Sequence, residues 1–283
     1  MKCPHCSGSI PEHSRLCPIC SRDVGFPNVR EARRQEECAA LDTRWKEVHA
    51  LALQQGRELV LSNFETAVKN SNAVLCRSLG IANWIISSGN ILFGTFWLEV
   101  EAGIRLPEDN VFDRARGAVD ATFFPFYERE IRFAALSLNG RGPEAYGACS
   151  IVLKDEVIAH RASVCDENTL VFCRRHSVIV GDPPPPGFRA TWSDRCRLAG
   201  AKLYGSLSEH MTAKDFPPIL LRQARATDEV DFIEVHIYGS MNRESIERML
   251  VPKGVLDVPE DALLVDSMRR KLAEVGAGLE IYS

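Results

Sequence analysis

Four cysteines with paired spacing stand at the start of the chain. Cys3 and Cys6 are separated by two residues, ten residues follow, and Cys17 and Cys20 repeat the same spacing. A Cys-x2-Cys pair forms a tight turn that points both sulfurs at one position, and two such pairs make a tetrahedral set of four thiolates. This donor set suits zinc, so we expect a structural zinc site with no coordination position left for a substrate.

Residues 1–25 are too few to bury a core, so metal binding should drive the folding of this segment. The spacing resembles the short zinc ribbons found at the head of many bacterial proteins. A closed site of this kind serves either as a docking module for a protein or nucleic acid, or as a folding cap or dimer contact.

A second group of reactive residues lies in "FIEVHIYGSM", residues 232–241. The run alternates as a strand does, which places Glu234 and His236 on one face and the three aliphatic residues between and beside them on the other. Two interpretations remain open for the polar face. It either lines a cleft, where a carboxylate can do chemistry, or it faces solvent.

Several catalytic motifs are absent from the sequence. It contains no GxxxxGK[ST] phosphate loop, no GxSxG, no HExxH and no Cys-x-Glu deaminase signature. Kinase and hydrolase functions therefore lose most of their support, and Glu234 becomes the most prominent candidate downstream of the cysteines.

"FIEVHIYGSM" and the following "NRESIERMLVP" resemble the last catalytic strand of ADP-ribosyltransferase-like domains, in which a strand glutamate precedes a turn. "EIRFAALSL" offers Arg132 on a first strand, and "YGACSIVLKDEVIAHRASV" offers Ser163 after a second. The resemblance covers roughly residues 125–283 and rests on order and residue type. The chain lacks the family's serine-threonine-serine triplet and has Phe232 where an upstream Gln or Glu is usual, so the acceptor group stays open.

The resemblance implies NAD as cofactor and assigns a role to each candidate. Glu234 would hold the ribose and stabilise its oxocarbenium-like centre, and Arg132 would bind the phosphates. Ser163 would support the glutamate, and Tyr146 or Tyr204 would stack on nicotinamide. Each residue also has an ordinary structural use, so the alternative is a non-enzymatic zinc-ribbon protein that docks a protein or nucleic-acid partner.

The remaining sequence predicts an α+β protein with three parts: the ribbon at 1–25, a helical region at 26–125 and an α+β domain at 126–283. We expect a long helix capped by Asn28 and a second helix over 57–74. Strands are expected at 131–138, 146–154, 169–180, 232–241 and 279–283, forming a mixed, mostly antiparallel sheet with flanking helices.

Composition restricts the partners. The 283 residues carry a formal net charge of −4, which gives no general attraction to nucleic acid, although Arg189, Arg195 and Arg197 cluster around Trp192. No apolar run reaches the roughly 18 residues that span a bilayer, and the N-terminus lacks an apolar signal core. We therefore expect a cytoplasmic protein without a membrane partner, acting on a macromolecular partner or acceptor.

Overall fold

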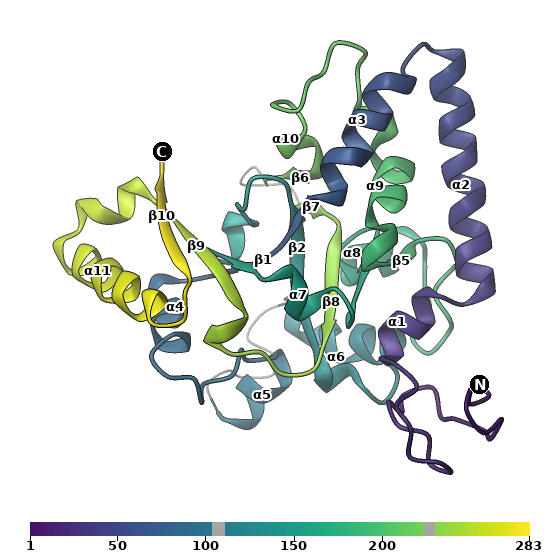
Figure 1. The fold of residues 1–283 in the computed structure, drawn as a ribbon, viewed down its shortest axis with the longest axis horizontal. Helices are drawn as coiled ribbons and strands as arrows, with labels where there is room; N and C mark the ends of the chain where they lie inside the picture. Colours follow the sequence, from purple (N-terminus) through teal and green to yellow (C-terminus); the bar gives the residue numbers. More distant parts are fainter. Residues whose placement is uncertain (104–110, 224–229) are drawn as a thin grey trace.

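The computed structural model describes residues 1–103, 111–223 and 230–283 (Figure 1). Its centre is an eight-stranded sheet in which only β9 and β10 run parallel, so the predicted α+β class with a mostly antiparallel sheet is confirmed. The strands, in order across the sheet, are β10 (Gly278–Tyr282), β9 (Ile246–Pro252), β3 (Cys149–Leu153), β1 (Asn72–Arg77), β2 (Ile131–Ser137), β8 (Glu234–Tyr238), β4 (Ala162–Cys165) and β5 (Arg189–Thr191).

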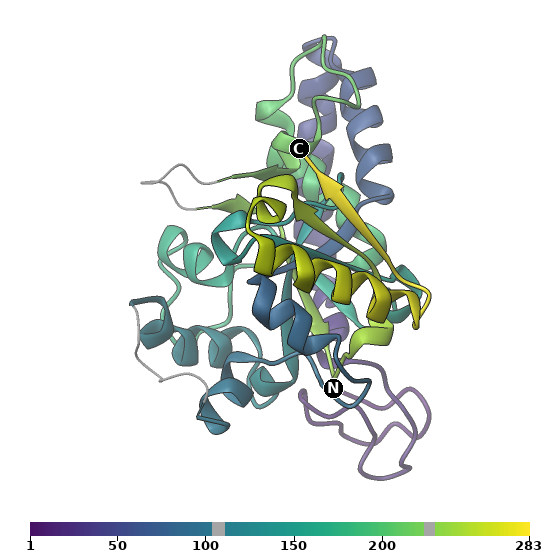
Figure 2. The ribbon, with the colours of Figure 1, turned by 90° about the vertical axis from the view of Figure 1, so that its left-hand side faces the viewer.

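One face of the sheet carries the main hydrophobic core. Alternate strand residues such as Ala134, Val235 and Ile237 join this core with the helix residues Leu61 and Phe64. Helix α11 lies across the sheet with α4 beside it (Figure 2). The α-helices that contribute to this core are α2 (Gln35–Gln54), α3 (Glu58–Lys69), α4 (Leu79–Ile85), α7 (Asp155–Ile158), α9 (Arg195–Leu203), α10 (Pro217–Leu220) and α11 (Pro259–Ala273).

The opposite face of β2, β8 and β4 is covered by a second, aromatic layer. Phe123 and Phe124 at the end of α6 (Val111–Phe123) and Phe172 of α8 (Thr169–Arg175) pack on Phe133 and Tyr238. The short α5 (Phe96–Glu101) lies at the edge of this layer. Residues of β8 that alternate away from the main core therefore meet protein, not water.

Two predicted elements are wrong. Residues 72–74, expected as the end of the helix over 57–74, instead begin the central strand β1, because α3 ends before Asn70 and four consecutive residues, 73–76, are buried between neighbouring strands. Residues 169–175, expected as a strand, form α8. Its Asn168 side chain caps the helix by accepting the Leu170 N–H, a local interaction that decides between helix and strand.

Asn28 was expected to cap a helix, and this expectation is also wrong. Helix α1 (Pro27–Ala32) begins at a proline, with Phe26 as its N-cap, and Asn28 is buried inside it. Its Nδ2 donates to the carbonyl oxygens of Arg161 (3.0 Å) and His236 (2.9 Å) and to Ser163 Oγ (3.2 Å). One side chain thus ties α1 to β4 and β8.

The sheet divides where β1 meets β2. Only three residue pairs join these strands, ending at Val74 and Ala135, whereas β2 stays paired with β8 back to Ile131. In Figure 1, β9 runs obliquely through the left half of the view, whereas β2 and β8 run up its centre. The chain segments 75–77 and 131–134 therefore separate and leave space between the two halves of the sheet.

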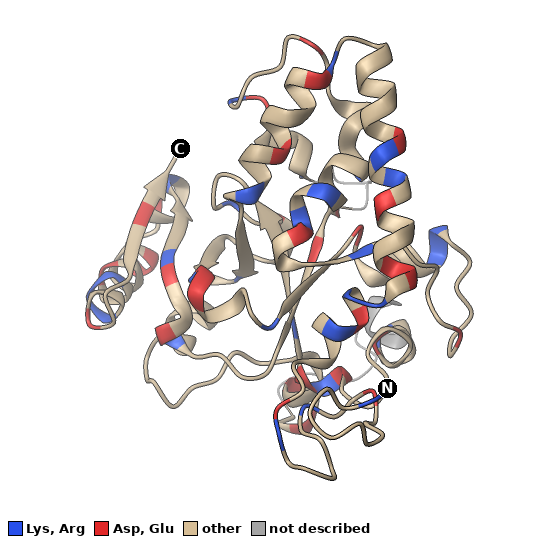
Figure 3. Cartoon of the chain, turned by 45° about the vertical axis from the view of Figure 1, so that its right-hand side comes forward, with Lys and Arg blue, Asp and Glu red and all other residues tan. Residues whose placement is uncertain are grey.

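The clustered arginines have internal partners. Arg189 forms an ion pair with Glu37, Arg197 forms one with Asp42, and Arg195 stacks on Trp192 with its Cζ 4.1 Å from the ring centroid. Both signs of charge are interspersed along the helices that surround them (Figure 3). Within the described residues, each helix is too short or too polar to cross a bilayer.

The Asn28 bridge gives a stability prediction. Asn28→Ala leaves two buried carbonyl oxygens without this donor, so the free energy of unfolding should fall by about 1–3 kcal/mol. Urea unfolding followed by circular dichroism measures it. Asn70→Ala is the matched control, since its amide donates to the Thr66 carbonyl oxygen at an exposed position. Equal effects of the two substitutions would contradict the bridging role.

Candidate functional site

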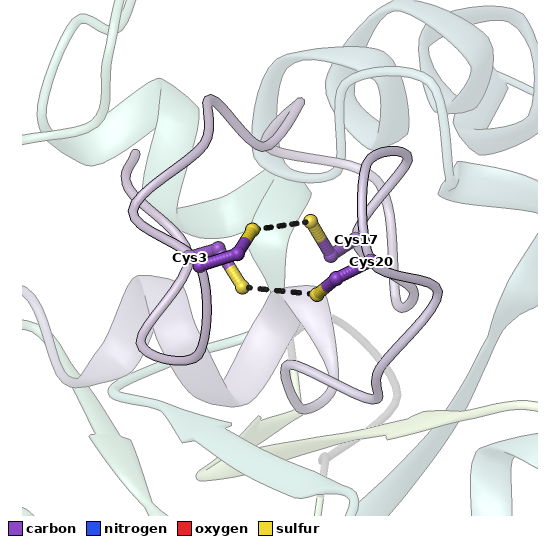
Figure 4. Close-up of side chains that lie close together, drawn as sticks. Cys3, Cys17 and Cys20 are labelled. Atoms are coloured by element: carbon purple, nitrogen blue, oxygen red, sulfur yellow. Dashed lines mark hydrogen bonds between the residues drawn. The ribbon is translucent and has the colours of Figure 1, made fainter.

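The four N-terminal cysteines meet as their spacing predicts. Their sulfurs all lie within 4.8 Å of one another, with Cys3 Sγ 3.7 Å from Cys20 Sγ and Cys6 Sγ 3.6 Å from Cys17 Sγ (Figure 4). Zinc–sulfur bonds of about 2.3 Å in a tetrahedron place sulfurs about 3.8 Å apart, whereas a disulfide holds them at about 2.05 Å. The donor set and its dimensions fit a four-thiolate zinc site.

The two halves of this site repeat one backbone turn. The Ser7 N–H donates to the Cys3 carbonyl oxygen (2.9 Å), and the Ser21 N–H donates to the Cys17 carbonyl oxygen (2.8 Å). Both serines adopt left-handed backbone angles, with φ of 60° and 57°. Each turn thereby curls around its cysteine pair and aims both sulfurs inward.

The acid–base chemistry of the thiols favours a bound cation. The backbone N–H of Cys20 lowers the pKa of Cys17 to about 6. The Gly8 N–H favours the Cys6 thiolate, but burial and the other sulfurs raise the pKa of Cys6 to about 12. Four sulfurs this close together resist carrying four negative charges, and a bound dication would offset their mutual repulsion.

The ribbon is anchored to α1. The Arg30 guanidinium donates to the carbonyl oxygens of Gly25 and Glu12, each at 2.6 Å, and Arg34 pairs with the Glu12 carboxylate at 2.8 Å. Arg15 lies over the Phe26 ring, with 4.5 Å between its Cζ and the ring centroid. Asn28 on the same helix hydrogen-bonds the backbone of β8. Helix α1 therefore links the ribbon to the strand that carries Glu234 and His236.

Glu234 and His236 share one face of β8, as predicted, but the interpretation of that face as solvent-exposed is wrong. They are 3% and 1% exposed because the aromatic layer covers them. Glu234 Oε1 accepts from Asn168 Nδ2 (2.8 Å), and Oε2 accepts from the Thr169 N–H (3.0 Å). His236 Nε2 lies 3.1 Å from Oε2.

Aromatic rings fix the histidine in turn. The His236 ring centroid is 4.8 Å from that of Phe124 and 5.5 Å from that of Phe133, both in edge-to-face arrangements. Glu234 is therefore oriented by three polar groups, one of which is itself immobilised by packing. The position of His236 on the same face now has a role, which is to orient the carboxylate.

Glu234 lines a cavity of about 290 Å³ where β1 and β2 separate. This volume is close to the lower end of typical small-molecule sites. The wall combines two carboxyl groups, guanidinium groups, an amide and aromatic rings, as binding sites for polar ligands do. Its polar and aromatic lining residues are Glu234, Glu99, Arg77, Arg116, Arg132, Thr95, Asn168, Phe96, Phe133, Tyr146 and Phe232.

Three of the five candidates for an NAD site line this cavity, namely Glu234, Arg132 and Tyr146. Ser163 is not among the described lining residues. It lies beside His236 on the same face and accepts from Asn28. Tyr204 is not among them either, since it is buried in the main core and its hydroxyl donates to Gln55.

Arg132 lines the cavity, but its side chain does not lie on the face of β2 expected for a partner of Glu234. It pairs with Ile237 while Glu234 pairs with Ala135, so by strand alternation its side chain belongs to the face of β2 opposite Glu234. The guanidinium is 4% exposed and donates to the Glu130 carbonyl oxygen at 2.9 Å. Burial lowers the pKa of Arg132.

Sequence reasoning missed Arg77, Arg116 and Asn168. Arg77 ends β1, and the preceding apolar run "AVLC" was the available signal, had it been interpreted as a strand. Arg116 and Asn168 come from α6 and the start of α8, and only the tertiary fold brings them to the cavity.

Comparison with protein-family models gives no match to the chain, and comparison with curated proteins gives none either. The basis for a functional proposal is therefore the chemistry of the cysteine site and of the cavity.

The cysteine site gives a metal prediction. Protein purified without chelator should contain about one zinc ion per chain, and Cys17→Ser should lose it because a serine hydroxyl does not replace a thiolate ligand. Metal analysis of the purified proteins measures this. Cys38→Ser is the control, since Cys38 is exposed on α2 outside the cluster. Metal-free wild-type protein, or full zinc occupancy in Cys17→Ser, would contradict the site.

Proposed function

We propose that the chain is a zinc-ribbon enzyme that cleaves the nicotinamide–ribose bond of NAD and transfers ADP-ribose to an acceptor. The observation that supports this best is the place of Glu234, a buried strand carboxylate that is oriented by polar donors at the wall of a cavity. The zinc ion would be structural, because its four thiolate ligands leave no position for substrate.

The reaction needs a fixed negative charge beside the ribose. When the bond to nicotinamide breaks, its electron pair leaves with the pyridine nitrogen and the ribose carbon becomes positively charged. A carboxylate already held in place stabilises this charge more in the transition state than in the ground state. The Asn168 amide and the Thr169 N–H hold Glu234 in position, so little reorganisation is required as the charge develops.

The cationic residues suit the pyrophosphate. Arg77 and Arg116 line the cavity along with Glu234. A guanidinium group can donate two parallel hydrogen bonds to the oxygens of one phosphate. We assign the phosphate role to these two, with Arg132 as part of the wall, because Arg132 is buried and its guanidinium donates to the Glu130 carbonyl oxygen.

The aromatic residues suit nicotinamide. Tyr146 and Phe232 line the cavity with their ring centroids 6.4 Å apart, and Tyr146 is 54% exposed. We assign stacking on nicotinamide to Tyr146. Tyr204 is not assigned a ligand role, because it packs in the main core.

A second candidate function is a non-enzymatic docking protein that uses the ribbon. Leu16 and Ile19 of the ribbon are 53% and 67% exposed, and the neighbouring Phe126 is 84% exposed with its ring centroid 5.4 Å from that of His13. Exposed apolar side chains of this size favour contact with a protein partner. This function requires no NAD.

The two functions differ in their response to NAD. NAD should raise the melting temperature under the first proposal, because a ligand that binds the native state stabilises it. Glu234→Gln should keep the fold and lower NAD cleavage about a hundredfold or more. Nicotinamide release, assayed with candidate acceptors present, measures this loss.

Glu247→Gln is the matched control for that substitution. It alters a glutamate on β9 that pairs with Arg248 and is not among the described cavity residues, so cleavage should stay at the wild-type rate. Wild-type protein that neither binds nor cleaves NAD would leave the docking function as the better proposal.

A further inference from the structure

Behind the cavity wall, α6 carries an acid directly beneath one of the lining arginines. Arg116 and Asp120 are one helical turn apart, with Arg116 Nε 3.3 Å from Asp120 Oδ2. Asp120 is 2% exposed, whereas Arg116 reaches the cavity. The acid is thus the buried member of the pair and the arginine is the member that would meet a ligand.

Rings fix the Arg116 guanidinium from two further elements. Its Cζ is 4.6 Å from the centroid of Phe133 on β2 and 5.7 Å from that of Phe96 on α5. Both rings also line the cavity. Side chains of α6, β2 and α5 therefore hold this cation at one place in the wall.

The surroundings of Asp120 disfavour its charge. Burial raises the pKa of Asp120 to about 7, against the attraction of Arg116 and with the added repulsion of Glu234 on β8. The proton on Asp120 is consequently exchanged in the neutral range, unlike that of an ordinary aspartic acid.

Other charged groups lie on the elements packed against α6. Arg129, in the short turn Glu128–Glu130, pairs with Glu101, and Arg175 of α8 pairs with Glu167. From α8, burial raises the pKa of Cys173, and burial lowers the pKa of His176, which follows that helix, so both are uncharged near neutral pH. From β8, His236 hydrogen-bonds Glu234, and from α5, Glu99 lines the cavity. Arg116 is therefore the cation nearest to Asp120 in this layer among the interactions described.

We propose that Asp120 is a positioning residue for Arg116, and that its protonation state sets the affinity of the cavity for a pyrophosphate-bearing nucleotide. Ionised Asp120 neutralises the charge of Arg116 and repels phosphate. When Asp120 is neutral, the positive charge of Arg116 is available to attract the phosphate groups of the ligand. Proton uptake by Asp120 and ligand binding then strengthen one another. The ligand class rests on the proposed function, but the coupling between proton and anion does not require bond cleavage.

The test is calorimetric titration of the full chain with ADP-ribose at about pH 6 and about pH 8. The pyrophosphate diester keeps its charge over this range, so a change in affinity belongs to the protein. Wild-type protein should bind about five- to tenfold more tightly at the lower pH. Asp120→Asn should bind with nearly equal affinity at both, because its amide oxygen still accepts from Arg116 but does not titrate.

Asp42→Asn is the matched control and should keep the wild-type pH dependence, since Asp42 lies on α2 and pairs with Lys46 and Arg197. Carbon-13 resonances of the Asp120 carboxyl in wild-type protein supply a second measurement that needs no variant. Their titration midpoint should lie near neutral pH and rise when ADP-ribose is added.

The inference would be overturned if ADP-ribose binding depended on pH equally in wild-type protein and in Asp120→Asn. It would also be overturned if ADP-ribose left the titration midpoint of Asp120 unchanged, or if the wild-type protein bound no ADP-ribose at either pH. Failure of the proposed function is distinguishable. If the protein binds ADP-ribose with the expected pH dependence but does not cleave NAD, the proposed enzymatic function is contradicted. The coupling between Asp120 protonation and ligand binding is then retained.

Discussion

The fold depends on satisfying a carboxylate that lies in the middle of a sheet. A buried, unpaired charge destabilises a protein by several kcal/mol, so Glu234 on β8 needs donors from elements outside its own strand. Asn168 and the Thr169 N–H at the start of α8 supply two, and His236 supplies a third contact. The aromatic layer of α6 and α8 must then cover this face, which turns a polar strand face into an internal one.

The cysteine cluster and the cavity lie in different parts of the structure but are joined through α1. Arg30 joins the ribbon to α1, and Asn28 joins α1 to the backbone of His236. We expect metal binding in the ribbon to stabilise the segment that precedes α1, and the proposed reaction to take place in the cavity between β1 and β2. This separation agrees with the general finding that a closed four-thiolate site is structural.

The sequence predicted the features that local spacing determines. The four cysteines are close in sequence, so their turns alone define the cluster, and the alternation of residues 232–238 placed Glu234 and His236 on one face. The burial of that face was not predictable, because it depends on helices distant in sequence. Strand β1 was not predicted, because four consecutive buried residues, 73–76, fit a helix or a central strand equally well. Arg77 at the end of this strand was therefore not identified as a site residue.

We propose that Glu234 faces a nucleotide in the cavity, and a crystal structure of the protein soaked with ADP-ribose tests this placement most directly. We predict that the ribose lies within hydrogen-bonding distance of Glu234 and that the pyrophosphate contacts Arg77 and Arg116. ADP-ribose bound elsewhere on the chain, with the cavity between β1 and β2 empty of it, would contradict the account.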